Sequence, residues 1–387
     1  MALRGALSRL SHSSRHFNHT YQQSRAHSVA VLGAPFSKGQ KKRGVEHGPK
    51  VIRDAGLMER LSNFDFSVHD FGDLNFQHLE EDEPYMDVKF PRTVGAANKK
   101  LSAAVRNAVS AGHTLLMLGG DHSLAVGSVS GHAQHSPDLC LIWVDAHADI
   151  NTPMTSPSGN LHGQPVAFML KELQDKMPDI PGFSWTKPFL SSRDLVYIGL
   201  RDVDPGEYQF LKSFGIQYFT MRDIDRLGIQ RVMEVTFDHL LARKQRPIHL
   251  SFDIDAFDPS LAPATGTPVN GGLTYREGIY IAEEIHNTGT DHYSYGFHFL
   301  WSFLDFLKVF DCLAFESNLS SSWCAGLLSV MDMVEVNPDL GASPEAVEAT
   351  ATLAVDVIAS SLGQTREGAH TSMDEIPPGK NDTELRL

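Results

Sequence analysis

The sequence predicts a doubly wound α/β domain with a mainly parallel sheet, and three observations support this prediction. Apolar, strand-like runs alternate with helical patterns along most of the 387 residues, as in chains built from β-α-β units. The runs are apolar almost throughout, which is typical of parallel strands covered by helices on both faces. Ionisable residues follow directly after several of these runs, where such sheets bind ligands.

Six segments are expected to form the strands, namely 28–35, 114–120, 139–147, 194–202, 247–255 and 327–336. Helical patterns between them are clearest at 91–112 and 275–289. With 42% apolar and 21% charged residues, the chain suits a globular domain with a large core. The three cysteines show no disulfide or zinc spacing, and Cys140 is expected to pack as a small buried hydrophobe.

The charge balance argues against some classes of partner. The net charge is −14, from 47 acidic and 33 basic residues, and no basic face for nucleic acid or a membrane surface is evident. The most apolar stretch, within 290–326, is interrupted by charged residues, so it does not resemble a membrane span. We therefore expect no nucleic-acid partner and no membrane-spanning segment.

The two ends of the chain differ in composition from the rest. Residues 1–27 are rich in Arg, Ser and His, contain no acidic residue and place Leu3, Leu7 and Leu10 at helical spacing. These features are typical of a mitochondrial transit peptide, with a plain disordered tail as the alternative. Residues 364–387 are polar and punctuated by Pro and Gly, so they are expected to form a flexible tail.

A chemically unusual pattern follows the third expected strand, in the stretch LCLIWVDAHADINTP (139–153). Asp145, His147 and Asp149 occupy alternate positions, so an extended backbone would point all three side chains to one side. Other strand ends add two more carboxylates and one more imidazole, from Asp253, Asp255 and His122. Four carboxylates and two imidazoles are therefore expected at one edge of the sheet.

This set of side chains favours a metal site over ordinary surface acids. Four carboxylates packed together would repel one another and raise their own pKa values, whereas two divalent cations would neutralise all four charges. A mainly oxygen ligand set with some imidazole suits Mn²⁺ better than a tetrahedral zinc site. The alternative, strand-end acids that cap helices or pair with arginine, explains either motif alone better than both together.

The residues around these ligands resemble the arginases of the ureohydrolase family. The resemblance rests on three motifs in order, GGDHS, DAHADINTPMTSPSGNLHG and SFDIDAFDPSLAPATGTPV, and it extends over 28–289 and 327–363. It implies a three-layer α/β/α fold and a single catalytic domain over 28–363. The basic start at 1–27 makes the chain most similar to mitochondrial, type II members, so a mitochondrial matrix location and a homotrimer are expected.

The resemblance also implies two Mn²⁺ ions per subunit. A hydroxide held between them would attack the guanidinium carbon of L-arginine, giving L-ornithine and urea. In this resemblance Asp145 and Asp253 bridge the two ions. One ion is also held by His122 and Asp149, and the other by His147 and Asp255.

Further roles follow from the same resemblance. His162 is the expected proton shuttle, since a histidine titrates near neutral pH, and Asp149 and Glu335 are expected to take part in catalysis with it. The residues expected to bind the amino-acid and guanidinium parts of the substrate are Asn151, Ser158, Asn160, Asp202, Asp204, Glu207, Thr267 and Glu335.

One segment, 290–326, departs from the family pattern. It holds two of the four Trp, two of the three Cys and six of the 22 Phe residues, in a position where helix-to-strand connections are usually short. Glycine codons at 289 and 326 are compatible with splice sites that would leave a single Gly. The segment is therefore interpreted as a retained intron or gene-model error, with a lineage-specific insertion as the rival.

Two alternative functions stay open at this point. An agmatinase-type ureohydrolase would act on a substrate without the α-carboxylate, which the expected roles of Asn151, Ser158 and Asp204 disfavour. A catalytically impaired or misfolded chain would result if the insertion at 290–326 disturbs the neighbouring strand, because a shift of one residue would turn Glu335 away.

Overall fold

A computed structural model describes residues 28–77, 79, 81–288 and 326–366 of the chain. Its centre is an eight-stranded sheet with the strand order β2-β1-β3-β8-β7-β4-β5-β6, in which all neighbouring strands are parallel. The strands are β1 (Ser28–Ala34), β2 (Ser67–Asp73), β3 (Thr114–Gly119), β4 (Cys140–Val144), β5 (Leu195–Leu200), β6 (Gln217–Thr220), β7 (Ile248–Asp253) and β8 (Leu328–Val334).

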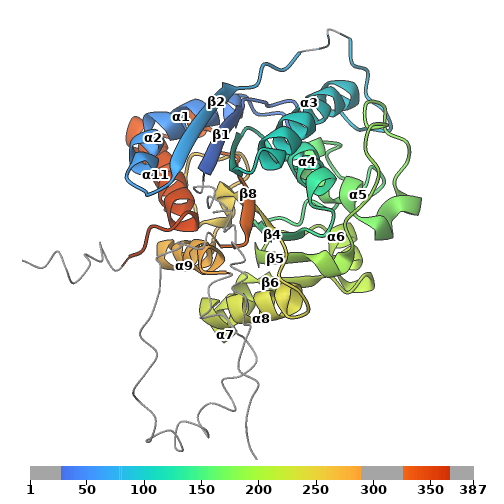
Figure 1. Cartoon of the computed structure of the whole chain (residues 1–387). Helices are drawn as coiled ribbons and strands as arrows, with labels where there is room; N and C mark the ends of the chain where they lie inside the picture. The colour runs from blue at the N-terminus through green and yellow to red at the C-terminus, as the bar shows by residue number, and fades with distance from the viewer. Residues whose placement is uncertain (1–27, 78, 80, 289–325, 367–387) are drawn as a thin grey trace, which may run out of the picture.

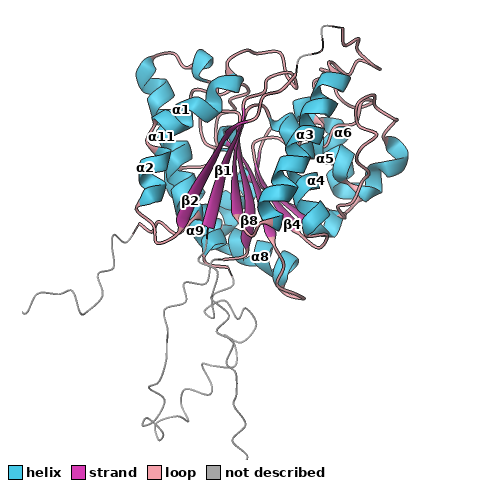
Figure 2. Cartoon of the chain, turned by 45° about the horizontal axis from the view of Figure 1, so that its top comes forward, coloured by secondary structure: helices cyan, strands magenta, loops and turns pink. Residues whose placement is uncertain are grey.

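Helices cover both faces of this sheet, as Figures 1 and 2 show. One face packs against α1 (Gly48–Asp54), α2 (Leu57–Ser62), α7 (Met221–Leu227), α8 (Ile229–Leu241), α9 (Tyr275–His286) and α11 (Pro344–Ser361). The other face packs against α3 (Pro91–Ser110), α4 (Ala125–His135), α5 (Pro165–Met169) and α6 (Pro205–Ser213). The predicted three-layer α/β/α fold with a parallel sheet is confirmed.

The six predicted strands are all present, but each is shorter than expected and two further strands were missed. The missed strands are the two edge strands of the sheet. Burial is weaker there: β2 is exposed along most of its length, and β6 has only four residues. Neither shows the continuous apolar run that marks a buried parallel strand. The predicted helix at 275–289 ends earlier, at His286.

The sheet separates the apolar core into two parts, one beneath each helical layer. Alternate residues of each strand point to opposite faces, so Cys140 and Ile142 of β4 face the layer with α8, while Trp143 faces the layer with α4. Cys140 is fully buried, as predicted, and burial raises the pKa of its thiol to about 12. Its thiol therefore stays protonated, as expected of a cysteine that serves only packing.

The core between α4 and the sheet also contains a polar cluster that the sequence did not indicate. Asp332 of β8 accepts hydrogen bonds from Ser128 Oγ and from His249 Nε2, the latter at 3.0 Å. The Nδ1 atoms of His249 and His132 are 3.2 Å apart. Burial, together with the neighbouring His249, lowers the pKa of His132 to about 2, so this imidazole stays neutral. The four side chains tie α4 to β7 and β8.

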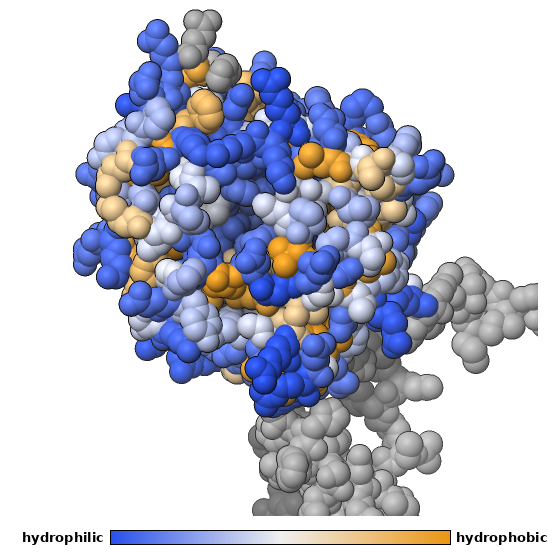
Figure 3. Space-filling view, turned by 180° about the vertical axis from the view of Figure 1, so that it is seen from behind, coloured by the Kyte–Doolittle hydropathy of each residue, from blue (hydrophilic) through white to orange (hydrophobic). Residues whose placement is uncertain are grey.

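Surface features fit a water-facing exterior on the side that Figure 3 shows. Hydrophobic residues there form small separate groups among hydrophilic ones. Among the described residues, no helix combines the length and apolarity that crossing a bilayer requires. Part of the predicted C-terminal tail is in place, since Arg366 donates to both carboxylate oxygens of Glu283 and Gln364 N donates to Ala359 O. The rest of that tail, from 367, and residues 1–27 lie outside the described part.

Candidate metal centre and substrate pocket

The predicted ligands converge at the carboxyl edge of the sheet because four neighbouring strands end there. His122 lies in a short 3-10 turn just after β3, Asp145 follows β4, Asp253 is the last residue of β7, and Glu335 follows β8. All four are buried. The parallel topology thus gathers residues that are up to 213 positions apart in the chain.

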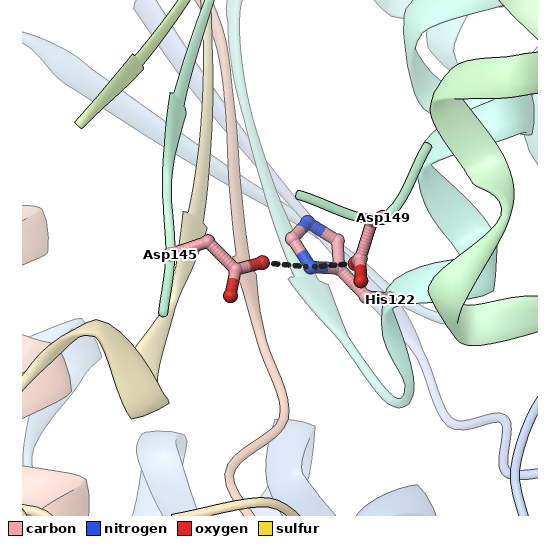
Figure 4. Close-up of side chains that lie close together, drawn as sticks. All are labelled: His122, Asp145 and Asp149. Atoms are coloured by element: carbon pink, nitrogen blue, oxygen red, sulfur yellow. Dashed lines mark ion pairs between the residues drawn. The ribbon is translucent and has the colours of Figure 1, made fainter. Parts of the chain in front are cut away.

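His122 stands at the centre of the first group of ligands. Its Nδ1 lies 3.0 Å from Asp145 Oδ2, 3.2 Å from Asp149 Oδ2 and 3.2 Å from Asp253 Oδ2. Figure 4 shows Asp145 and Asp149 pointing toward the imidazole from two sides. The other ring nitrogen, Nε2, is 2.9 Å from Ser251 Oγ, so Nδ1 is the nitrogen directed at the carboxylates.

A second group shares Asp145 with the first. His147 Nδ1 lies 3.3 Å from Asp145 Oδ1 and 3.3 Å from Asp255 Oδ2. Ligand atoms of these three residues come close enough to hold one ion, and the same is true of His122, Asp145 and Asp149. The predicted ligands therefore form two adjacent groups around one common carboxylate.

The convergence was predicted correctly, but the backbone that produces it was not. The strand β4 ends at Val144, and the residues after it form bends instead of the expected extended chain. Asp149 has a φ of 50°, in the left-handed region that few non-glycine residues adopt. Asp255 likewise belongs to a short 3-10 turn after β7. These turns fold back the chain so that nearby residues reach the same point.

The pKa values of the carboxylates show the electrostatic cost of this arrangement. Burial and the charges of neighbouring carboxylates raise the pKa of Asp253, and burial with the charge of Asp145 raises that of Asp149 to about 6. Burial also tends to raise the pKa of Asp145, but the nearby imidazoles of His122 and His147 lower it overall. Without a cation, protons on the imidazoles and on some of the acids would have to balance the buried charge.

The ligand atoms fit divalent metal ions. His122 Nδ1 is buried and has no hydrogen-bond partner among the described residues, although three carboxylate oxygens lie within 3.2 Å. A metal-ligating histidine typically has one ring nitrogen fixed by a hydrogen bond and the other directed at the metal site. His122 has this geometry, with Nε2 next to Ser251 and Nδ1 facing the carboxylates. Two divalent ions would supply four positive charges, which match the four carboxylates of the two groups.

A pocket of about 140 Å³ opens beside these ligands. Residues from the metal groups form its floor, and polar loops form its walls. Its lining consists of His147, Asp149, Asn151, Ser156, Pro157, Ser158, His162, Gly163, Asp202, Asp204, Glu207, Asp253 and Thr267. All the predicted substrate-binding and catalytic positions except Glu335 and Asn160 line the pocket. Two further predicted metal ligands, His147 and Asp253, line it as well.

Three predicted substrate residues form one connected wall of the pocket. Asn151 Nδ2 donates to Asp204 Oδ2 at 2.8 Å. Glu207 accepts from Ile150 N at 3.0 Å and from Asp204 N at 3.0 Å, and it closes the first turn of α6. Burial and the charge of Asp149 raise the pKa of Glu207 to about 8. Through these backbone hydrogen bonds, Glu207 fixes the positions of Asn151 and Asp204.

The remaining predicted substrate residues differ in exposure. Ser158 and Asp202 are exposed at the mouth of the pocket, and Asp202 lies 3.8 Å from His147 Nε2. Thr267 lies deeper, with its Oγ1 donating to Asp255 Oδ2 at 2.9 Å. Asn160 is half-buried next to the wall, but it is not among the residues that line the pocket.

His162 and Glu335 lie together between the pocket and the core. His162 Nδ1 is 3.3 Å from Glu335 Oε1, which also accepts from His122 N at 2.9 Å. Burial lowers the pKa of His162, but Glu335 and the other nearby carboxylates outweigh it and raise the pKa to about 9. Glu335 has a φ of 65°, so its backbone is strained where it turns the carboxylate towards both histidines.

Several residues at the site were missed by sequence reasoning. Trp143 stacks on His122, with ring centroids 4.1 Å apart, and its Nε1 donates to Asp145 Oδ2 at 3.0 Å. Asp121 accepts from Gly39 N at 2.8 Å. The hints in the sequence were that Asp121 directly precedes His122 and that Trp143 stands two residues before Asp145.

The segment 38–44 (KGQKKRG) is a loop with exposed Lys41, Lys42 and Arg43, and it also contacts the loops of the site. His162 N donates to Gly39 O at 3.0 Å, and Lys42 Nζ donates to Gly266 O, next to Thr267. Asn337 Nδ2 donates to the carbonyl of Arg43 at 3.0 Å. The high charge of the segment predicts its exposure but not these long-range contacts.

Fold and site together define a class: parallel α/β proteins with a carboxylate-rich site for two metal ions at the carboxyl edge of the sheet. The model of the arginase family matches residues 27–293, and the chain belongs to this family. It is 57% identical to the mitochondrial Arginase-2 of Homo sapiens, over all of this chain and 99% of that protein.

Other comparisons agree with this assignment. The chain is 62% identical to the Arginase, non-hepatic 1 of Xenopus laevis, over 92% of this chain and 89% of that protein. The solved structure of arginase from Bacillus caldovelox superposes with a TM-score of 0.71 at 34% identity, over 88% of this chain and 99% of that one. The resemblance seen in the sequence motifs is confirmed.

Proposed function

We propose that this chain is a metal-dependent hydrolase that converts L-arginine and water to L-ornithine and urea. The observation that carries the proposal is the pair of ligand groups that share Asp145 and lie beside a pocket lined by both acidic and uncharged polar residues. The relatives named arginase support the choice of substrate. An amino acid with a cationic side chain matches this distribution of charge.

Two Mn²⁺ ions are the proposed cofactors, because the ligand set is rich in oxygen and includes imidazole nitrogen. His122 and Asp149 would hold one ion, His147 and Asp255 the other, and Asp145 with Asp253 would bridge them. When bound, the ions supply the Lewis acidity that activates water at neutral pH. Trp143 and Ser251 keep two of these ligands in place through the hydrogen bonds described above.

The surrounding residues would bind the substrate and move protons. Asn151 and Ser158 present amide and hydroxyl groups suited to an α-carboxylate, with Asn160 beside them, and Asp204 with Asp202 faces the α-amino end, supported by Glu207. Thr267 and Glu335 lie near the guanidinium end.

His162 is the proposed proton shuttle. Its imidazole reaches the pocket while Glu335 holds Nδ1, so Nε2 is the atom proposed to exchange protons with solvent and with the leaving amine. Asp149, at the floor of the pocket, completes the proposed catalytic group.

Comparing L-arginine with agmatine tests the substrate against the agmatinase alternative. Agmatine lacks the α-carboxylate, so it forfeits the contacts proposed for Asn151 and Ser158. We expect kcat/KM for agmatine to be at least about 10²-fold lower, since loss of a charged group with two hydrogen bonds costs about 3 kcal/mol. The measurement is urea release from each substrate. Equal or faster turnover of agmatine would replace the proposed substrate.

We further propose that the domain spans 28–363 and is complete without the insertion at 290–326. The described residues on either side of it are in contact, since Leu327 N donates to Thr288 Oγ1 at 3.0 Å. Leu327 O in turn accepts from Ile248 N at 2.8 Å, at the amino end of β7 and therefore at the sheet edge opposite the metal ligands. One residue could join Thr288 to Leu327.

A variant that joins Gly289 directly to Leu327 tests this proposal. We expect it to fold and to release urea from L-arginine at a rate no lower than that of the full chain. Thermal unfolding and specific activity of the two chains, compared side by side, provide the measurement. An inactive or unfolded deletion variant beside an active full chain would show that the insertion belongs to the domain.

Location and assembly are further parts of the proposal. Relatives that the chain matches are named mitochondrial, and the acid-free start at 1–27 supports import into the mitochondrial matrix. Import of the labelled chain into isolated mitochondria would test this. A homotrimer is proposed from the family resemblance alone, and light scattering of the purified chain would decide it.

A further inference from the structure

The turn at 85–90 has a backbone that ordinary residues rarely adopt. Tyr85 and Val88 form an antiparallel bridge, and the two residues between them, Met86 and Asp87, have φ values of 50° and 65°. Phe90, just before α3, has a φ of 49°. Left-handed conformations at three non-glycine residues persist only where surrounding contacts enforce them, and they concentrate at functional sites.

These contacts are made with the loop 156–160, which forms the neutral wall of the pocket. Lys89 N donates to Gly159 O at 3.0 Å, and Lys89 Nζ donates to Ser158 O at 2.6 Å. Lys89 Nζ also lies 3.4 Å from Asn160 Oδ1. The main chain and the side chain of one residue therefore hold three consecutive residues of the loop.

The two segments pack too closely to shift independently. A Cβ atom at Gly159 would lie 1.9 Å from Asp87 O, and Gly159 has a φ of 67°. Only glycine permits this backbone contact, so the position of the turn determines the position of the loop. Ser158, which lines the pocket, lies directly beside this contact.

The wall held in this way is where an anionic group of the substrate would bind. Its lining residues, Ser156, Pro157 and Ser158, carry no charge, whereas Asp202, Asp204 and Glu207 elsewhere in the pocket lining are acidic. Lys89 brings an ammonium group against this wall, and burial together with the nearby Lys41 lowers the pKa of Lys89. Positive charge is thus added next to the uncharged wall.

We propose that Lys89 is a positioning residue that sets affinity for the carboxylate-bearing end of the substrate. Its ammonium group fixes the Ser158 carbonyl and the Asn160 side chain, so the hydroxyl and amide groups of the loop stay directed at the pocket. Its charge also favours an anion at that wall. This inference rests on the proposed hydrolysis of L-arginine.

Lys89→Met in the manganese-loaded full chain tests the inference, with Lys89→Arg and Lys50→Met as controls. Met keeps the length of the side chain but loses a charge-assisted hydrogen bond, so KM for L-arginine should rise about 10-fold while kcat changes less than about 2-fold. Arg should keep most of the affinity. Lys50, on α1 with its side chain 75% exposed, should have no effect.

Binding of two amines separates positioning from a general loss of structure. Measured by calorimetry, Lys89→Met should lower the affinity for L-ornithine about 10-fold. It should lower the affinity for 1,4-diaminobutane, which lacks the carboxylate, less than about 2-fold. Equal losses for both amines, or an unchanged L-ornithine affinity, would overturn the inference. A wild-type chain that binds L-ornithine but releases no urea from L-arginine would instead refute the proposed function.

Discussion

Asp145→Asn is expected to lower kcat for L-arginine by about 10³-fold or more and to reduce the metal content of the protein. Asp145 is the carboxylate common to both ligand groups, and both its oxygens are engaged: Oδ1 by His147 N at 2.7 Å and Oδ2 by Trp143 Nε1 at 3.0 Å. The amide keeps the shape but removes the negative charge that two cations would share. Loss of several kcal/mol of electrostatic stabilisation corresponds to this fall in rate.

The measurement combines steady-state urea release with metal analysis of the purified variant. Asp54→Asn is a matched control, because Asp54 is an aspartate on α1 with its side chain 58% exposed and paired with Lys50. It should leave both quantities unchanged. An Asp145→Asn protein that retains two ions and wild-type kcat would show that the shared carboxylate is not a ligand.

Asp332→Ala is expected to reduce the free energy of unfolding by about 3–5 kcal/mol. Asp332 is fully buried, and its removal leaves Ser128 Oγ and His249 Nε2 without their acceptor in the core. Breaking a buried, hydrogen-bonded polar pair from one side typically costs this much, because the remaining group stays desolvated and unpaired. Urea unfolding of the metal-free chain measures the change.

Two further variants show whether the cluster is responsible. Asp332→Asn retains an oxygen acceptor and should cost less than the alanine variant, and Asp238→Ala, on the exposed side of α8, should change stability by less than about 0.5 kcal/mol. A loss below about 1 kcal/mol for Asp332→Ala would contradict the stabilising role assigned to the cluster.

The fold was predictable wherever strands were buried on both faces. Their continuous apolar runs identified six strands, including β4 and β7, and the parallel arrangement followed from the intervening helices. The strand β2 was not predictable in this way, since as an edge strand it carries exposed residues such as Phe71, which is 50% exposed. The polar cluster around Asp332 was also hidden, because one buried acid in an apolar run has no distinctive pattern.

The site was predictable in its ligands but not in their support. Spacings of two residues after strands singled out Asp145 and Asp253, and the structure brings them within reach of His122. The support depends on backbone turns and long-range contacts, such as the φ of 50° at Asp149 or the stacking of Trp143 on His122. Such contacts follow from the folded topology, which local sequence patterns do not encode.

Manganese titration of urea release tests the central claim most directly. The full 387-residue chain is stripped of metal, and L-arginine hydrolysis is followed as Mn²⁺ is added. The account predicts no turnover without metal and activity that saturates when two ions are bound per chain. Turnover that persists in the stripped chain, or no urea release from a chain that has bound two Mn²⁺ ions, would contradict it.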